Sequence, residues 1–124
     1  MSGAALKTTT GLTGLAVSKN SHQILGVLYG KILRTLQKMP ESATYRKHTE
    51  AIIKERGDIL HSTPAVEEVE RKINCGQIEE LIVQAGNELN LARKMLTWKP
   101  WEPLTKTVPP NQWSWPPAQP VKQR

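Results

Sequence analysis

The 124-residue sequence contains no phenylalanine and a single cysteine, Cys75. One thiol excludes an intrachain disulfide and any zinc or iron–sulfur site that needs several cysteines. The aromatic residues are two tyrosines and four tryptophans, and all four tryptophans lie at or beyond position 98. The part of the chain upstream of them must therefore build an almost entirely aliphatic core.

The sequence also lacks a long apolar run. Its longest stretch without a charged residue, 107–121, is rich in prolines and polar side chains, whereas a membrane-spanning helix needs about 20 mainly apolar residues. We therefore expect a soluble chain. Its length allows one domain.

Acidic residues are scarce at both ends of the chain. Residues 1–48 carry seven basic side chains against Glu41 alone, and residues 98–124 carry four against Glu102 alone. The middle segment, 49–97, has nine acidic and six basic side chains, and the whole chain has a net charge of +6. Such a polarised charge distribution is typical of a protein that docks in one orientation.

Apolar residues at three- and four-residue spacing predict helices between residues 20 and 97. The first helix begins near Asn20, which can cap it together with Gln23, and Pro40 ends it. The second begins near Ser42 and ends by Ser62. The apolar positions of these two helices are Leu25, Leu28, Tyr29, Ile32, Leu33, Leu36, Tyr45, Ile52, Ile53, Ile59 and Leu60.

A third helical pattern follows Thr63 and Pro64, which fit an N-cap and the first helical position. Asn74, Cys75 and Gly76 interrupt this pattern, either as a true C-cap or as a kink. The longest apolar stripe of the sequence then runs from Ile78 to Leu96. Because the connections are short, we expect an all-α fold, an antiparallel up-down three-helix bundle over residues 20–97.

The first nineteen residues differ in composition from the bundle. Residues 1–19 are rich in Ser, Thr and Gly and contain no acidic residue, which predicts a flexible N-terminal arm. Their composition is loosely like that of a mitochondrial presequence, but the arginines typical of one are missing.

Seven of the nine prolines fall at or beyond position 100. They exclude a helix or a central strand and predict an extended, Trp/Pro-rich docking tail over residues 98–124. Burying an indole stabilises a structure by about 2–3 kcal/mol, so the tryptophans should lie against a surface. We expect Trp98 or Trp101 to close the end of the bundle. The predicted partner-binding residues of the tail are Trp98, Pro100, Trp101, Trp113 and Trp115.

Lys31, Arg34 and Lys38 form a basic stripe on the first predicted helix, which Arg46 and Lys47 can extend. A solvated helix face is the default interpretation of such a stripe. The alternative is a face that orients the protein on an acidic partner, and we include these three residues among the partner-binding candidates.

No pattern of catalytic or metal-ligating residues is present. His22, His48 and His61 are too far apart for a paired metal motif, and no local signature gathers a nucleophile with its base. The glycine pairs do not form a phosphate-binding loop. The sequence therefore predicts a protein that is not an enzyme and binds no cofactor or metal.

Several segments resemble one known family. The runs 77–80, 87–95 and 98–104 (QIEE, NELNLARKM and WKPWEPL) are joined by TTGL at 9–12, GLAV at 14–17, YRK at 45–47 and QWSWP at 112–116. Together they closely resemble the 13 kDa accessory subunits of mitochondrial NADH:ubiquinone oxidoreductase, complex I, called alpha subcomplex subunit 5. The resemblance covers nearly the whole chain.

This resemblance implies a non-catalytic three-helix protein of the respiratory chain, imported into mitochondria and without a redox centre. Its place would be the matrix side of the inner membrane, in the peripheral arm, with membrane association only through the complex. Its partners would be other complex I subunits, including the 30 kDa iron–sulfur-fraction core subunit, and its role would be assembly or stability of the arm during electron transport.

Two alternatives remain open at this point. The pI of about 9.7 would suit a small nucleic-acid-binding module, but the basic stripe lacks interleaved aromatic residues, so we expect no nucleic-acid partner. The second is the group of small helical proteins with a Leu-Tyr-Arg motif that dock acyl carrier protein. Here Leu28 and Tyr29 are followed by Gly30 instead of arginine.

Overall fold

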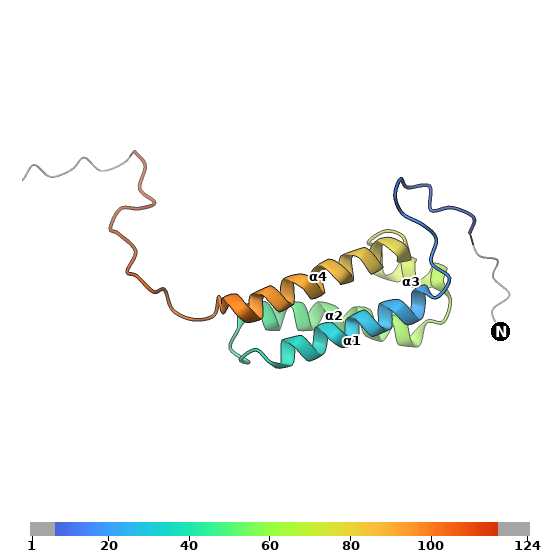
Figure 1. Ribbon diagram of the computed structural model, residues 1–124, viewed down its shortest axis with the longest axis horizontal. Helices are drawn as coiled ribbons and strands as arrows, with labels where there is room; N and C mark the ends of the chain where they lie inside the picture. Colours follow the sequence, from blue (N-terminus) through green and yellow to red (C-terminus); the bar gives the residue numbers. More distant parts are fainter. Residues whose placement is uncertain (1–6, 117–124) are drawn as a thin grey trace, which may run out of the picture.

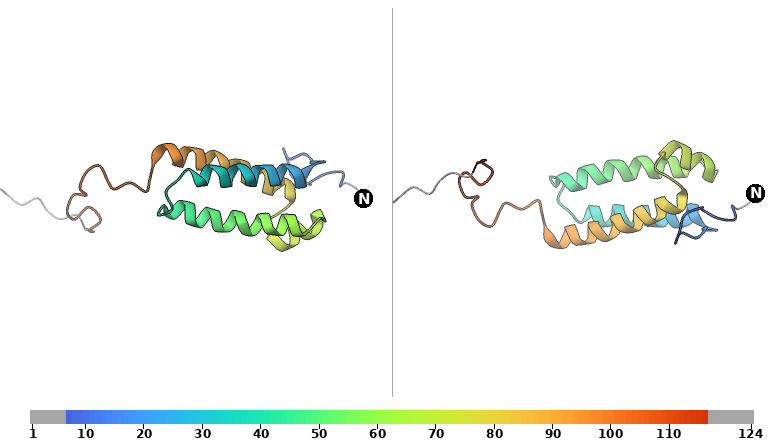
Figure 2. Two further views of the ribbon diagram at one scale, coloured as in Figure 1. Left: turned by 90° about the horizontal axis from the view of Figure 1, so that it is seen from below. Right: turned by 90° about the horizontal axis from the view of Figure 1, so that it is seen from above.

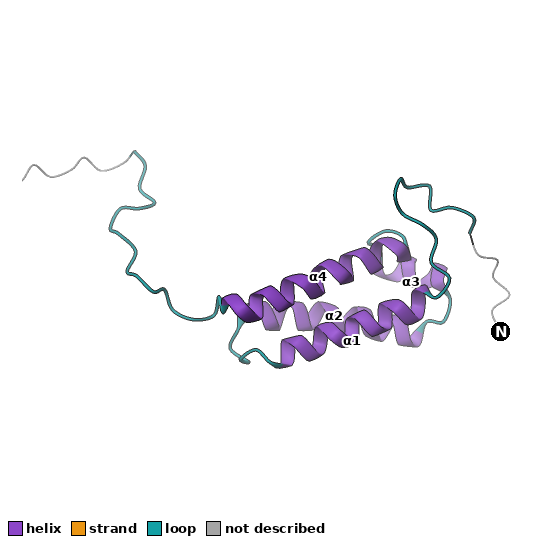
Figure 3. Ribbon diagram, viewed as in Figure 1, coloured by secondary structure: helices purple, strands orange, loops and turns teal. Residues whose placement is uncertain are grey.

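The computed structural model describes residues 7–116, and four helices form all the regular secondary structure in that range (Figures 1 and 3). They are α1 (Ser21–Gln37), α2 (Thr44–Ser62), α3 (Val66–Ile73) and α4 (Ile78–Trp98). The predicted all-α class is confirmed. The third predicted helical pattern is divided near Gly76 into α3 and α4, a break that the sequence left open, so that the described chain has four helices. The outermost parts of the predicted arm and tail, 1–6 and 117–124, lie outside the described residues.

The three long helices lie side by side, and the short α3 occupies the connection between α2 and α4 at one end (Figures 1 and 2). Helices α1 and α4 run in the same direction, with α2 antiparallel to both. Helix α1 packs closely against α4 and also against α2, whereas α2 and α4 make little contact with each other. Helix α1 is therefore the centre of the bundle.

The core lies between the facing stripes of the helices. Its buried members are almost all aliphatic, and Tyr29 is the one aromatic side chain among them. Full burial of one such side chain stabilises a fold by about 1.5–3 kcal/mol. The largest fully buried side chains are Leu25, Ile32 and Leu36 of α1, Leu60 of α2, Thr63 after it, Val69 of α3, and Ile78 and Leu81 of α4.

Of the two predicted N-cap residues, Asn20 and Thr63, the first stands where it was predicted and the second does not. Asn20 stands at the N-cap of α1, but its side chain makes no capping hydrogen bond. Thr63 ends α2 instead of starting α3, and its backbone N–H donates to the Ile59 carbonyl at 3.1 Å. Pro64 accounts for the end of α2, since a residue before proline avoids the helical region. Pro64 does not begin the next helix, because the N-cap of α3 is Ala65 and the helix starts at Val66.

The interruption at residues 74–77 is a true helix end. Asn74 takes the left-handed conformation with φ of 57° and donates its backbone N–H to the Glu70 carbonyl at 2.9 Å. Gly76 follows with φ of 103°. Helix α4 then opens with a capping box, in which the Gln77 backbone N–H donates to Glu80 Oε2 at 2.7 Å. Two adjoining caps explain why one apolar pattern yields two helices.

The described part of the N-terminal arm is attached to the start of α4. Lys7 Nζ lies 2.5 Å from Glu79 Oε2 and 2.8 Å from Gln77 Oε1. The Gln77 side-chain amide donates to the Thr10 carbonyl at 2.6 Å, and the Ser18 backbone N–H lies 3.4 Å from Glu79 Oε1. We call this set of contacts the arm clasp. The sequence predicted the arm but not the clasp.

Glu79 is the central group of the arm clasp, with only 3% of its surface exposed. Burial acts to raise its pKa, but the hydrogen bonds from Lys7 and from backbone N–H groups outweigh burial and hold the pKa below its ordinary value of 4.5. The folded chain therefore favours ionised Glu79. The resulting stabilisation is present above about pH 4.5 and is lost as the pH falls through the lower pKa of the folded chain.

Replacing Lys7 by methionine should lower the free energy of unfolding by about 1–2 kcal/mol at neutral pH, because a buried carboxylate then lacks its cation. Urea unfolding followed by circular dichroism measures this difference. Lys19→Met, which removes an exposed lysine of the same arm, is the matched control and should leave stability within about 0.5 kcal/mol. The effect of Lys7→Met should shrink in acid. An effect that is equal at pH 7 and pH 3 would contradict the assignment to ionised Glu79.

Candidate functional site

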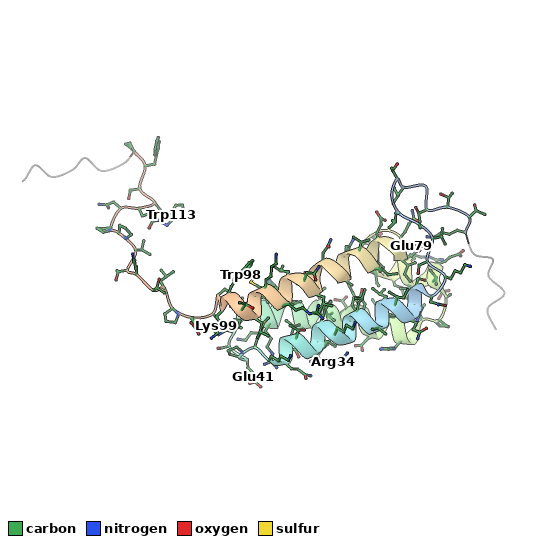
Figure 4. The ribbon with its side chains drawn as sticks, viewed as in Figure 1. Arg34, Glu41, Glu79, Trp98, Lys99 and Trp113 are labelled. Carbon is green, nitrogen blue, oxygen red and sulfur yellow. The ribbon has the colours of Figure 1, made fainter. Side chains whose placement is uncertain are left out.

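The four tryptophans occupy different surroundings. Trp98 is the last residue of α4 and is 63% exposed, while Trp101 packs partly buried against the hydrophobic core. Trp113 and Trp115 lie on the tail, 89% and 88% exposed, and the picture shows Trp113 well away from the bundle (Figure 4). One of the first two indoles thus closes the bundle, as expected. The five predicted tail residues do not form one site.

The segment that carries these side chains is 99–116, which contains turns but no helix or strand. It leaves the bundle at Lys99, whose left-handed conformation (φ 54°) ends α4. Pro100 is exposed directly after it, and Leu104 and Val108 are 74% and 45% exposed further along. The described tail therefore presents several apolar groups to solvent besides Trp113 and Trp115.

Lys31, Arg34 and Lys38 are exposed along one face of α1. None of the three forms an ion pair within residues 7–116. The basic side chains that do form ion pairs in this range are Lys7, Arg46 and Lys54. Arg46 does not extend this basic face, because its guanidinium donates to the Met39 carbonyl at 2.6 Å and pairs with Glu50. Lys31, Arg34 and Lys38, the α1 basic face, therefore lie open to an acidic partner.

The histidines serve no common site. His22 Nε2 lies 2.6 Å from the Leu60 carbonyl and so links α1 to the end of α2, whereas His48 and His61 are exposed. Within residues 7–116 no three metal-ligating side chains gather. In the same range no helix combines the length and hydropathy needed to cross a membrane.

A groove that the sequence did not predict lies where the backbones of α2 and α4 stand apart and side chains alone bridge the two helices. It has a volume of about 430 Å³, with α2 and α4 as walls and Tyr29 of α1 among its lining residues. We call it the α2–α4 groove. Its apolar lining includes Ile53 and Ala85, and Ile52 and Leu91 are 46% and 38% exposed at its rim. The polar lining residues are Thr49, Arg56, Gln84, Asn87 and Glu88.

Two polar groups of the groove are incompletely paired. The Tyr29 hydroxyl is buried and has no hydrogen-bond partner among the described residues. Arg56 forms no ion pair there; its guanidinium lies 3.4 Å from Gln84 Oε1 and 3.3 Å from Cys75 Sγ. Burial raises the pKa of Tyr29, and the nearby Arg56 partly offsets this effect. By contrast, Tyr45 of α2 donates its hydroxyl to Glu88, which lines the groove.

Comparison with known proteins identifies the family. Residues 14–80 match the family described as the ETC complex I subunit conserved region. The chain is 52% identical to NADH dehydrogenase (ubiquinone) 1 alpha subcomplex subunit 5 of Bos taurus over 111 residues, covering 90% of this chain and 96% of the relative. The Mus musculus protein of the same name is 51% identical with the same coverage.

A more distant relative extends the comparison to plants. The probable NADH dehydrogenase (ubiquinone) 1 alpha subcomplex subunit 5, mitochondrial, of Arabidopsis thaliana is 41% identical over 98 residues, which cover 79% of this chain and 58% of the relative. The chain therefore belongs to the alpha subcomplex subunit 5 family of NADH dehydrogenase (ubiquinone), respiratory complex I.

Proposed function

We propose that this chain is a non-catalytic accessory subunit of respiratory complex I, which supports the assembly and stability of the matrix-facing peripheral arm. The observation that carries this proposal is the 52% identity to a relative whose name makes it a complex I subunit, over 96% of that relative. Two proteins that use the same surfaces to bind the same neighbouring subunits are expected to share sequence identity over their whole length. The nucleic-acid-binding and Leu-Tyr-Arg alternatives find no support in the names of the relatives.

The proposed location is the matrix side of the mitochondrial inner membrane, reached only through the complex. The plant relative named as mitochondrial supports the organelle. The proposed neighbours are other complex I subunits, with the 30 kDa iron–sulfur-fraction core subunit among them. Electron transfer itself belongs to those neighbours, and this chain contributes contact surface.

The tail is the first proposed contact. Trp113 and Trp115 expose most of their surface in the isolated chain, and transferring each indole to an apolar environment would stabilise a complex by about 2 kcal/mol. The prolines around them reduce the entropy lost when the segment becomes ordered on a partner. Trp98 and Pro100, exposed where the tail leaves α4, extend this contact, and Trp101 fixes the tail to the bundle.

The full-length chain should migrate with the large NADH-oxidising complex on a native gel of mitochondrial membranes, which tests the proposed function. In cells that lack the endogenous protein, replacing Trp113 and Trp115 together by alanine should lower incorporation at least tenfold. The thermal unfolding of the isolated variant should be unchanged, because both indoles are exposed. Trp113→Phe with Trp115→Phe is the matched control and should retain most incorporation. Full incorporation of the alanine variant would refute the anchor role.

The α1 basic face is the second proposed contact. Three cations without an ion partner in the described chain should steer it toward an acidic surface and set its orientation. This contact is weaker than the apolar one, since exposed ion pairs contribute about 0–1 kcal/mol each.

Changing Lys31, Arg34 and Lys38 together to serine should reduce incorporation several-fold at low salt, and the difference from wild type should shrink as salt rises, since salt screens the attraction that the variant has lost. The control changes Arg71, Arg93 and Lys94, which are also exposed and lie outside the tail, and alters the net charge by the same amount. Quantitative immunoblots of native gels measure both. Equal losses in the two variants would show that total charge matters and not this face.

A further inference from the structure

We propose that the α2–α4 groove holds an amphipathic helix of a neighbouring subunit, with a carboxylate on its apolar face that pairs with Arg56 and accepts the Tyr29 hydroxyl. The proposal rests on the proposed function, because its occupant belongs to the same complex. It goes further by assigning a third contact surface, distinct from the tail and the α1 basic face, and by stating the chemistry of the partner.

The shape of the bundle supports a helix as the occupant. Both α2 and α4 pack on α1 but make little contact with each other, so the side facing away from α1 is open. A fourth helix takes this position in a four-helix bundle, where it covers the apolar edges of its two neighbours. Ile52 and Leu91, exposed on opposite walls of the groove, are such edges.

The polar groups of the groove specify the chemistry of its occupant. A buried hydroxyl whose proton has no acceptor costs about 1–3 kcal/mol. Arg56 lies near enough to lower the pKa of Tyr29, but a guanidinium only donates hydrogen bonds and cannot accept that proton. A carboxylate can accept from the Tyr29 hydroxyl and pair with Arg56 at once. The contact of Arg56 with Gln84 Oε1 is long at 3.4 Å, and its contact at 3.3 Å is to Cys75 Sγ, a weak acceptor, so the side chain can move toward an incoming anion.

The carboxylates of this chain do not fill the role. Glu88, the acidic side chain that lines the groove, accepts the hydrogen bond of Tyr45. Glu102 is the one acidic residue of the tail, and it follows Trp101, which packs on the core. That anchor lies beyond the end of α4, about 21 Å along the helix axis from Gln84. The missing acceptor is therefore best supplied by another polypeptide.

The test uses full-length variants expressed in cells that lack the endogenous protein. Tyr29→Phe removes the unpaired hydroxyl, so the isolated chain should unfold at a higher urea concentration while its incorporation into complex I falls two- to fivefold. A purely structural role would move stability and incorporation in the same direction. Incorporation at the wild-type level would overturn the proposal.

Arg56→Glu should lower incorporation at least tenfold, whereas Arg56→Lys, which keeps the charge, should restore most of it. The control Arg93→Glu makes the same charge change at an exposed position of α4 and should stay within twofold of wild type. Equal losses in Arg56→Glu and Arg93→Glu would overturn the proposal while the proposed function stands. A wild-type chain that migrates alone would instead remove the proposed function, and the groove proposal with it.

A cross-link identifies the occupant. In a Cys75→Ser background, Ile52→Cys carries a maleimide-linked benzophenone, and irradiation of the assembled complex should join this chain to a second subunit through a segment that contains Asp or Glu. The same label at Ser62→Cys, an exposed position at the end of α2 outside the groove, should not form that product. An adduct confined to this chain's own tail would overturn the proposal.

Discussion

The contact on which the structure depends is the apolar face of α1. Leu25, Ile32 and Leu36 on this face are fully buried, and both long neighbours of α1 pack against it. Because α2 and α4 share this one surface and make little contact with each other, two sides of the bundle are closed and one stays open. The compact core and the α2–α4 groove therefore have the same origin.

The limited size of this core decides which apolar side chains remain exposed for partners. The aliphatic residues of the helices complete the core with the help of Tyr29 and Trp101. The remaining indoles and the exposed apolar residues of 99–116 have no place in it. A small bundle has limited capacity for burial, so a chain with such a tail buries the rest of its apolar surface only in an assembly. Membership of a complex I subunit family agrees with this physical property.

Much of the fold could be predicted from periodicity, since an apolar residue every three or four positions specifies a helix and its buried face. The residues at which each helix begins and ends could not be predicted in this way. Thr63 and Pro64 fit a helix start as well as a helix end, and the tertiary position of α2 decides between them. Lys7 and Glu79 are separated by 72 residues, so no local pattern predicts the arm clasp. For the same reason the groove, which three helices form together, was not predicted.

The candidate site was predictable only in part. Sequence composition identified the exposed indoles and the α1 basic face, because the large apolar surface of tryptophan and the charge of lysine and arginine do not depend on the fold. It indicated that Trp98 or Trp101 would close the bundle but not which of the two, and it did not indicate that Arg46 is already paired within the chain. Nor did it indicate that Tyr29 lacks an acceptor, since this depends on the burial of one atom.

Hydrogen exchange, compared between the isolated chain and the chain within assembled complex I, tests most directly whether burial is completed by partners. We predict that backbone amides of α1 exchange slowly in both states, whereas amides of 99–116 gain strong protection only on assembly. Fast exchange throughout 99–116 in the assembled complex would contradict this account of the protein.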